Sequence, residues 1–413
     1  MLRSIFPLSS LLLGVALLLL GSGLLSTLLA VRGGIEGFDS QTLGAIGAMY
    51  FVGFLAGTYL GPLMIRRVGH VRAFAFFTAA IACATLLHEL FISPWLWGLL
   101  RLITGMSMVG LYTIIESWLN SHAAPEQRSR IFAVYMGVNL GSLAIAQQLL
   151  QTSDPAQHIL FALAAVSICA AVMPVAATRL TQPHMDEVQS IGLKVLYERA
   201  PVACAAALLS GFSQGAFWGL GPVWADISQL GTSGIAWFMT LTIIGGALFQ
   251  WPIGQLTNHL DRGHVISVVA LGAAVLAGAL LLAEGHKLQL VLLAGFIYGG
   301  LAFTVYPLAV ARMMDRLDKR EIISGCGSLL LLHGIGATIG PLIAGSLMHH
   351  FGPQALPGWF ITVQLSLAAT AWAFSVRAPA DLGHQRPLTP MVRTTPGVME
   401  MLEIPLEAEN PGR

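Results

Sequence analysis

Long apolar stretches separated by short polar gaps make up most of the chain. Runs of about twenty apolar residues, the length that crosses a hydrocarbon core of about 30 Å, recur about a dozen times. The pattern predicts membrane helices at residues 6–31, 42–65, 72–92, 94–119, 129–151, 157–178, 199–222, 232–255, 264–284, 288–311, 322–347 and 356–377. The first run is too long for the apolar core of a signal peptide and is interpreted as a membrane helix.

The longest internal polar interruption divides these helices into two sets of six. It predicts an N-terminal bundle at residues 1–180, a cytoplasmic loop at 181–198 and a C-terminal bundle at 199–377. Residues 378–413 are polar and rich in proline, a composition typical of a disordered tail, here predicted to be cytoplasmic.

Basic residues are concentrated in every second gap between the apolar runs, and Arg32 and Lys287 are the main exceptions. Loops rich in lysine and arginine stay in the cytoplasm during insertion. The alternation therefore predicts an even number of spans in the cell inner (plasma) membrane, with both termini in the cytoplasm. The basic gaps contain Arg66, Arg67, Arg72, Arg128, Arg130, Arg179, Lys194, Arg199, Arg262, Arg312, Arg316, Lys319 and Arg320.

The composition supports a membrane protein, with 55% hydrophobic and 10% charged residues and a mean hydropathy of +0.75. The net charge of +1 indicates no nucleic-acid partner. The four cysteines lie far apart inside apolar runs, without the spacing of metal ligands. The chain has no glycine-rich nucleotide loop and no hydrolytic residue set, so we predict no cofactor, no metal and no enzyme activity.

The loop after the second run resembles a motif of the major facilitator superfamily, Gly-x-Leu-x-Asp-Arg-x-Gly-Arg-Arg. Arg67 and Gly69 match it, while Pro62 replaces the first glycine and Arg66 replaces the aspartate; Arg72 closes the loop. A helix N-terminus that would favour the aspartate repels an arginine, so the family's gate cannot be transferred unchanged.

The loop after the eighth run is similar to a weaker copy of the same motif. Gly254 and Leu256 match, Asn258 replaces the aspartate and Asp261 replaces the later glycine, with Arg262 following. The two loops are about half of the helical region apart. This spacing and the resemblance imply an all-α membrane protein whose twelve transmembrane helices form two pseudo-symmetric six-helix bundles.

Further segments carry the same resemblance. Arg101 and Gly105 match the superfamily's helix 4 signature, Arg-x-x-x-Gly. Within the superfamily the chain resembles the YcaD-like branch, through Gln250-Trp251-Pro252-Ile253-Gly254, Glu116-Ser117, Gly299-Gly300-Leu301-Ala302-Phe303-Thr304-Val305-Tyr306-Pro307 and Thr394-Thr395-Pro396. The resemblance implies a transporter whose cavity is lined by helices 1, 4, 7 and 10.

Two charged residues fall inside the fourth predicted helix. Arg101 lies at a depth where insertion costs at least ~2.5 kcal/mol, so it is either a structural arginine that snorkels or an anion-binding residue. Glu116 lies ~22 Å further along the helix. It is expected near Arg66, Arg72 or Arg130 in a gating salt bridge, with a proton-carrying ligand as the alternative.

Polar and aromatic residues on the seventh and tenth predicted helices are candidates for the cavity wall. Gln214, Phe217 and Trp218 lie in the seventh helix. Tyr298 and Tyr306 in the tenth are eight residues apart, which predicts both phenols on one face. A tyrosine such as Tyr306 also suits a membrane interface.

Asn139 and His333 occupy comparable positions in the two halves, in the fifth and eleventh predicted helices. His333 is either a hydrogen-bonded structural residue or a proton carrier, since histidine titrates near neutral pH. Gly336, Gly340 and Pro341 predict a hinge and a close helix contact.

These features predict a secondary active transporter that works by alternating access. The expected partners are a small organic solute, amphipathic or weakly anionic, a coupling proton and the lipid bilayer, and we expect a monomer. Export is favoured over uptake on family grounds alone. An uptake permease of the same fold and a non-transporting membrane sensor are the alternatives.

Overall fold

The computed structural model describes residues 2–122, 127–178, 192–257, 260–282, 287–318 and 321–377. Within these ranges the chain is helical and contains no strand. Asn258, most of the predicted 181–198 loop and the predicted 378–413 tail lie outside them.

The helices follow one another with short connections. They are α1 (Leu2–Ile35), α2 (Ser40–Val68), α3 (His70–Leu90), α4 (Pro94–His122), α5 (Arg128–Leu149), η2 (Leu150–Thr152), α6 (Ile159–Ala170), α7 (Val172–Ala176), α8 (Leu193–Arg199), α9 (Pro201–Ile227), α10 (Gly231–Leu248), α11 (Gln250–Leu256), α12 (Arg262–Leu281), α13 (Leu288–Ala302), α14 (Val305–Met314), α15 (Ile322–Phe351) and α16 (Ala355–Arg377).

Twelve helical segments of the described chain are long and apolar enough to cross a membrane. Their bounds agree with the predicted ranges to within a few residues at each end, so the twelve-helix prediction is confirmed. Three of these segments consist of two consecutive α-helices: α6 with α7, α10 with α11, and α13 with α14.

Each of the three interruptions lies three or four residues before a proline. Proline offers no N–H to the carbonyl four residues earlier, and its ring crowds that carbonyl. The pairs are Ala171 with Pro174, Phe249 with Pro252, and Phe303 and Thr304 with Pro307. Pro62, Pro222 and Pro341 lie inside uninterrupted helices.

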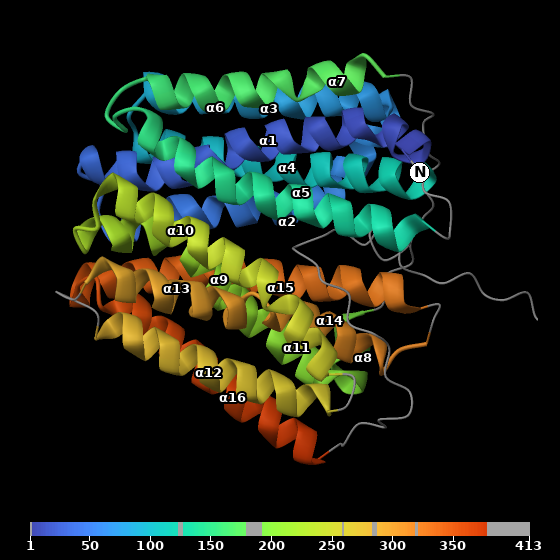
Figure 1. Ribbon diagram of the computed structural model, residues 1–413, viewed down its shortest axis with the longest axis vertical. Coiled ribbons are helices and arrows are strands. Elements are labelled where there is room, and N and C mark those ends of the chain that lie inside the picture. The colour runs from blue at the N-terminus through green and yellow to red at the C-terminus, as the bar shows by residue number, and fades with distance from the viewer. Residues whose placement is uncertain are drawn as a thin grey trace, which may run out of the picture.

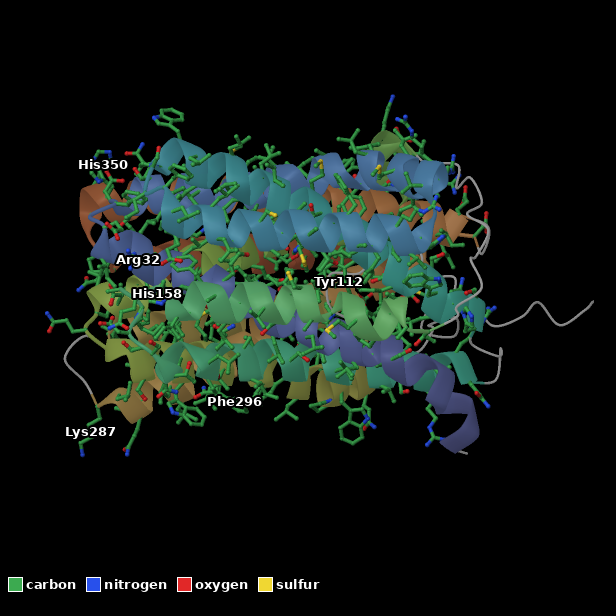
Figure 2. The ribbon with its side chains drawn as sticks, turned by 90° about the horizontal axis from the view of Figure 1, so that it is seen from above. Arg32, Tyr112, His158, Lys287, Phe296 and His350 are labelled. Atoms are coloured by element: carbon green, nitrogen blue, oxygen red, sulfur yellow. The ribbon has the colours of Figure 1, made fainter. Side chains whose placement is uncertain are left out.

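The helices run roughly side by side, and the N-terminus lies at the same end as α7 and α8 (Figure 1). We call this end the N-terminal side. Arg32, His158, Lys287 and His350 lie at the other end, which we call the opposite side (Figure 2).

The helices are arranged as two bundles, with α1–α7 in one and α9–α16 in the other (Figure 1). Within the bundles α2 packs along α4, and α9 packs along α15. Between them α2 packs on α15, α5 packs on α10, and α9 contacts both α1 and α2. The predicted two-bundle architecture is confirmed.

On the opposite side the two bundles touch through glycine backbones. A Cβ atom added to Gly47 would lie 3.1 Å from the Cα atom of Gly219. One added to Gly345 would lie 2.6 Å from the carbonyl oxygen of Ser40. Helices approach this closely only where side chains are absent.

Hydrogen bonds between α5 and α10 reinforce the same side of the interface. The Gln148 amide donates to Thr240 Oγ1 at 2.5 Å. Thr240 in turn donates to the carbonyl oxygen of Ala144 at 3.1 Å. The described contacts therefore hold the two bundles together on the opposite side.

Candidate functional site

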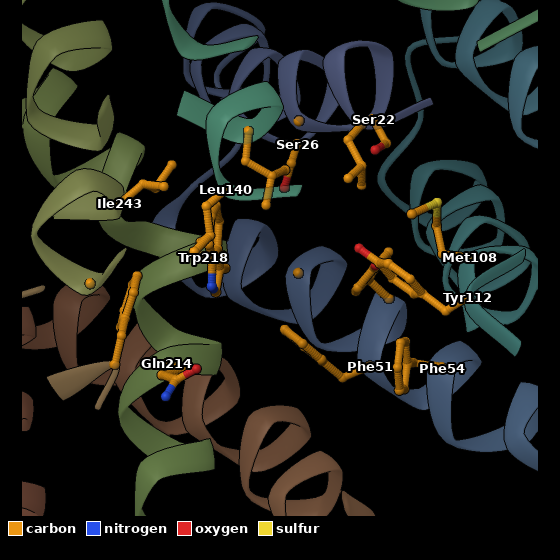
Figure 3. A pocket seen from close by; sticks show the side chains of 18 of the residues that line it. Ser22, Ser26, Phe51, Phe54, Met108, Tyr112, Leu140, Gln214, Trp218 and Ile243 are labelled. Atoms are coloured by element: carbon orange, nitrogen blue, oxygen red, sulfur yellow. The ribbon is translucent and has the colours of Figure 1, made fainter. Parts of the chain in front are cut away.

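A cavity lies between the two bundles and encloses about 1160 Å³ of space outside the atoms, its opening to solvent included. One wall comes from α1, α2, α4 and α5, and the other from α9, α10, α11 and the α13–α14 segment (Figure 3). Gly47 and Gly219 are lining residues, so their contact closes the cavity on the opposite side. Among the described residues no group of His, Cys, Asp and Glu is arranged to hold a metal ion.

Arg101 carries the only formal charge among the described residues of the cavity lining. Its side chain is 7% exposed, and its guanidinium carbon lies 4.5 Å from the centre of the Tyr50 ring. A cation over an aromatic face is held by the ring quadrupole. Arg101 therefore faces the cavity, held by an aromatic ring from the neighbouring helix α2.

The facing wall of the cavity is aromatic. The Trp218 ring stacks on Phe303 with centroids 6.1 Å apart and planes inclined by 20°. Phe217 meets both rings edge-on, at 5.7 Å from Trp218 and 5.4 Å from Phe303. Trp218 and Tyr112 approach the open centre from opposite sides in Figure 3.

Four of the predicted cavity residues line the cavity: Arg101, Gln214, Trp218 and Tyr306. They come from both bundles, from α4, α9 and α14. Gln214 is 6% exposed, and its amide points towards the open centre in Figure 3.

Phe217 and Tyr298 lie behind the lining. Phe217 is 1% exposed and supports Trp218 from within the bundle. The Tyr298 hydroxyl is 2.7 Å from Ser213 Oγ, and its ring stacks on Phe360. The turn at residues 303–304 separates Tyr298 from Tyr306, so the two phenols do not share a surface as the sequence spacing predicts.

His333 and Asn139 are also buried behind the lining. The ring of His333 lies 4.7 Å from that of Tyr306, and its Nδ1 is 3.1 Å from Ser210 Oγ. Asn139 is 2% exposed on α5. His333 is thus separated from the cavity by one aromatic ring.

Several lining residues are absent from the sequence prediction. Ser22 and Ser26 interrupt the first apolar run four residues apart, which places both on one helix face. That spacing is a signal that sequence reasoning could have used. Tyr50 and Phe303 carry no comparable signal, because an aromatic residue in an apolar helix is equally suited to lipid or to packing.

Glu116 lies near the C-terminal end of α4, towards the N-terminal side of the molecule, and is completely buried. Its Oε1 is 3.4 Å from the hydroxyl of Tyr135, the donor, on α5. Arg66, Arg72 and Arg130 are exposed. The predicted salt bridge between Glu116 and one of these arginines stays a prediction.

The first motif loop joins α2 to α3 through a tight turn. Gly69 has a φ of 84°, a left-handed value that favours glycine. Pro62 lies inside α2, and Arg67 is exposed. The glycine of the motif is therefore explained by backbone geometry.

The second motif loop enters a buried ionic network. Asp261 caps α12 by accepting from the N–H of Gly263 at 2.6 Å. The Arg312 guanidinium lies 3.4 Å from the same carboxylate. Arg262 donates to the carboxylate of Asp315 at 2.6 Å. Two arginine–aspartate pairs thus cross between the start of α12 and the end of α14.

Gly336, Gly340 and Pro341 lie in α15, which is continuous from Ile322 to Phe351. A Cβ atom on Gly336 would collide with the carbonyl oxygen of Leu208, and one on Gly340 with that of Phe212. These glycines therefore allow α15 to pack closely on α9, and their hinge role stays a prediction.

Comparison with known proteins agrees with this fold. Residues 203–399 match the family model of the Major Facilitator Superfamily. This match and the similarity to YcaD-type transporters support a transport protein of the major facilitator superfamily, whose members are not enzymes. Within it the chain is 27% identical over 357 residues to the MFS-type transporter YcaD of Escherichia fergusonii, covering 85% of this chain and 91% of that protein.

Two further comparisons extend the match. YcaD of Escherichia coli is 27% identical over 387 residues, or 92% of this chain and 96% of that protein. The crystal structure of the nucleoside transporter NupG superposes with a TM-score of 0.74 at 15% identity, covering 91% of this chain and all of that one. At this identity the NupG structure supports the fold alone.

Proposed function

We propose that this protein is a secondary active transporter that exports an amphipathic or weakly anionic organic solute across the cell inner membrane. It works as a monomer by alternating access and is coupled to protons. Both termini face the cytoplasm, so the N-terminal side is the cytoplasmic side.

The position of Arg101 is the observation that carries the proposal. A buried cation in a membrane is energetically costly unless it faces other protein groups or a water-filled cavity. Arg101 faces a cavity shared by two bundles, and no carboxylate lies among the described lining residues. A solute with a negative group supplies the missing charge and touches both bundles, which a carrier that alternates between two states requires.

Two buried titratable groups support coupling to protons. Glu116 contacts Tyr135, and His333 contacts Ser210 and the Tyr306 ring at the edge of the cavity. Ionisable residues inside membrane proteins commonly form proton relays. The direction of export rests on family resemblance alone.

Transport by purified protein in sealed vesicles tests the proposal. Candidate solutes come from comparing metabolites inside and outside cells with and without the protein. We expect counterflow of a confirmed solute to fall at least about tenfold in Arg101→Ala and to recover partly in Arg101→Lys, since a charge-assisted hydrogen bond contributes about 1.5–3 kcal/mol. Unchanged flux in Arg101→Ala would make Arg101 structural.

An imposed pH gradient separates the remaining alternatives. Coupled export responds to the gradient and dissipates it, whereas an uptake permease responds with the opposite sign. A solute flux that is the same with and without the pH gradient excludes proton coupling. If no solute moves in either direction, the non-transporting sensor becomes the better account.

A further inference from the structure

The two chemically distinctive groups of the cavity belong to different bundles and lie at similar distances from the ends of their helices. Arg101 is about two turns into α4 from Pro94, roughly 10 Å along the helix axis. Trp218 is about two and a half turns from the end of α9 at Ile227, roughly 13 Å. Both helix ends are on the opposite side. The cation and the aromatic platform both line the cavity near its glycine-closed end, because Trp218 directly precedes Gly219 and Arg101 lies over Tyr50, about one turn from Gly47.

We infer that the solute is a small aromatic monocarboxylate, bound with its carboxylate on Arg101 and its ring on Trp218. The inference rests on the proposed transport function and narrows its substrate. It places one half of the ligand on each bundle.

The charge of the lining limits the charge of the ligand. Arg101 is its only formally charged group among the described residues, so it balances one negative charge. A cation would be repelled by the guanidinium and would find no described carboxylate in the lining. A guanidinium presents its N–H groups in a fork that matches a carboxylate.

The aromatic wall selects for a flat ring. Trp218 is half-buried, with one side supported by Phe303 and its edge by Phe217. The ring is thus fixed in orientation, and its remaining surface contributes to the cavity lining. Stacking of a second ring on such a platform strengthens binding by about twofold to tenfold beyond burial of the same area. A saturated ring of equal size lacks this contribution.

The arrangement also gives the ligand a mechanical role. A ligand that holds Arg101 on the first bundle and Trp218 on the second stabilises the closed contact between Gly47 and Gly219. Removing either group leaves a ligand attached to one bundle.

Equilibrium binding to the full-length protein in lipid nanodiscs tests the inference. The probes are radiolabelled benzoate, phenylacetate and 3-phenylpropionate, with cyclohexanecarboxylate, benzyl alcohol and benzylamine as competitors. We expect at least one aromatic acid to bind, and to bind more tightly than cyclohexanecarboxylate by at least about twofold. Benzyl alcohol and benzylamine should compete at least about tenfold less well.

Variants assign the two contacts separately. Arg101→Gln should remove the preference for the acid over the alcohol, and Arg101→Lys should keep it in part. Trp218→Leu should bring the ratio of aromatic to saturated acid to about one, and Trp218→Phe should preserve it. Trp95→Leu and Lys194→Gln are the matched controls, because Trp95 is 91% exposed and Lys194 lies on the exposed helix α8.

The affinity ratios are measured only on variants that remain monodisperse. If Arg101→Gln or Trp218→Leu fails to fold, the conservative variants Arg101→Lys and Trp218→Phe replace it. The inference is overturned if no aromatic acid binds, if the saturated acid binds equally well, or if Trp218→Leu leaves the ratio unchanged. Transport of a different solute would then leave the proposed function intact. Binding with the expected ratios but without flux in vesicles would instead overturn transport.

Discussion

The guanidinium of Arg262 donates to both carboxylate oxygens of Asp315 at 2.6 Å, and its side chain is fully buried. It also donates to the carbonyl oxygen of Ala311 at 2.8 Å. The pair joins the start of α12 to the end of α14 across fifty-three residues of sequence. Its two side chains, 0% and 8% exposed, are more buried than those of the neighbouring Arg312–Asp261 pair, at 3% and 12%.

Arg262→Met should destabilise the protein strongly, because it leaves the Asp315 carboxylate buried without its main partner. Breaking a buried pair costs about 3–5 kcal/mol, whereas replacing both partners by apolar residues is often close to neutral. Thermal unfolding in detergent should show a large loss of stability for Arg262→Met. The double variant Arg262→Met with Asp315→Leu should recover most of that stability.

The control for this prediction is Arg199→Ala. Arg199 pairs with Glu321 at 2.6 Å, but its side chain is 44% exposed. Its loss should cost less than about 1 kcal/mol. Equal losses at the two sites would show that burial does not determine the strength of these pairs.

Gly47→Val should weaken the closed state of the opposite side, because its side chain would meet the backbone of Gly219. Overpacking costs about 1–3 kcal/mol, roughly a fivefold to hundredfold shift between two states. Labelling of Ser26→Cys by an impermeant maleimide should therefore increase. The measurement uses a background without the four native cysteines.

Gly137→Val is the matched control, since a Cβ atom on Gly137 has nothing within 4 Å. Its labelling should equal that of the parent protein. Equal labelling of Gly47→Val and Gly137→Val would exclude the glycine contact as a gate.

Glu116→Gln should uncouple solute movement from the proton gradient. The amide keeps the size of the buried side chain and its contact with Tyr135, but it cannot carry a proton. We expect counterflow to persist and gradient-driven flux to fall at least about tenfold, as expected on loss of a positioned proton carrier. Tyr135→Phe tests whether the phenol takes part in the same step.

The coupling role would be refuted if Glu116→Gln retained full gradient-driven flux. Loss of both counterflow and driven flux would instead identify Glu116 as part of the gate.

Asp39→Ala should lower stability at neutral pH by about 1 kcal/mol or less, because Asp39 is the N-cap of α2 and is half exposed. The N–H of Thr42 donates to its carboxylate at 2.7 Å and lowers the pKa of Asp39 below its ordinary value. The contribution is therefore complete above the ordinary pKa of about 4 and is lost as the pH falls through the lower folded-state value.

Thermal unfolding between neutral and acidic pH measures this difference. Asp39→Asn is the control, since asparagine caps a helix without titrating. A stability gap between the parent protein and the Asp39→Ala variant that widened as the pH fell would contradict the assignment.

Hydropathy predicts the helices of this protein well because every span must satisfy its backbone internally and present apolar side chains to lipid. The same reasoning identifies Arg101 as a candidate site residue, since a charge inside an apolar run is conspicuous in the sequence. It does not identify Tyr50 as a site residue, because the Tyr50 ring lies under the arginine from another helix. Pairing across helices is a tertiary property.

The interrupted helices account for the main differences at the site. Pro307 follows the turn at residues 303–304 that interrupts its helix, whereas Pro341 lies in an unbroken helix. The presence of a proline alone therefore does not determine whether a helix is interrupted. The turn brings Phe303 onto Trp218 and separates Tyr298 from Tyr306. Periodicity assumes a continuous helix and so assigns both tyrosines to one face.

The sequence by itself determined the number of spans, the division into two sets of six and the presence of a cation within the membrane. These depend on local composition and on the length of a bilayer crossing. The tertiary structure decided that Arg101 faces a cavity, that Trp218 lines the same cavity from the other bundle, and that Arg262 meets Asp315. Those relationships depend on how separate helices rotate and pack against one another, and packing of apolar helices leaves little trace in the order of their residues.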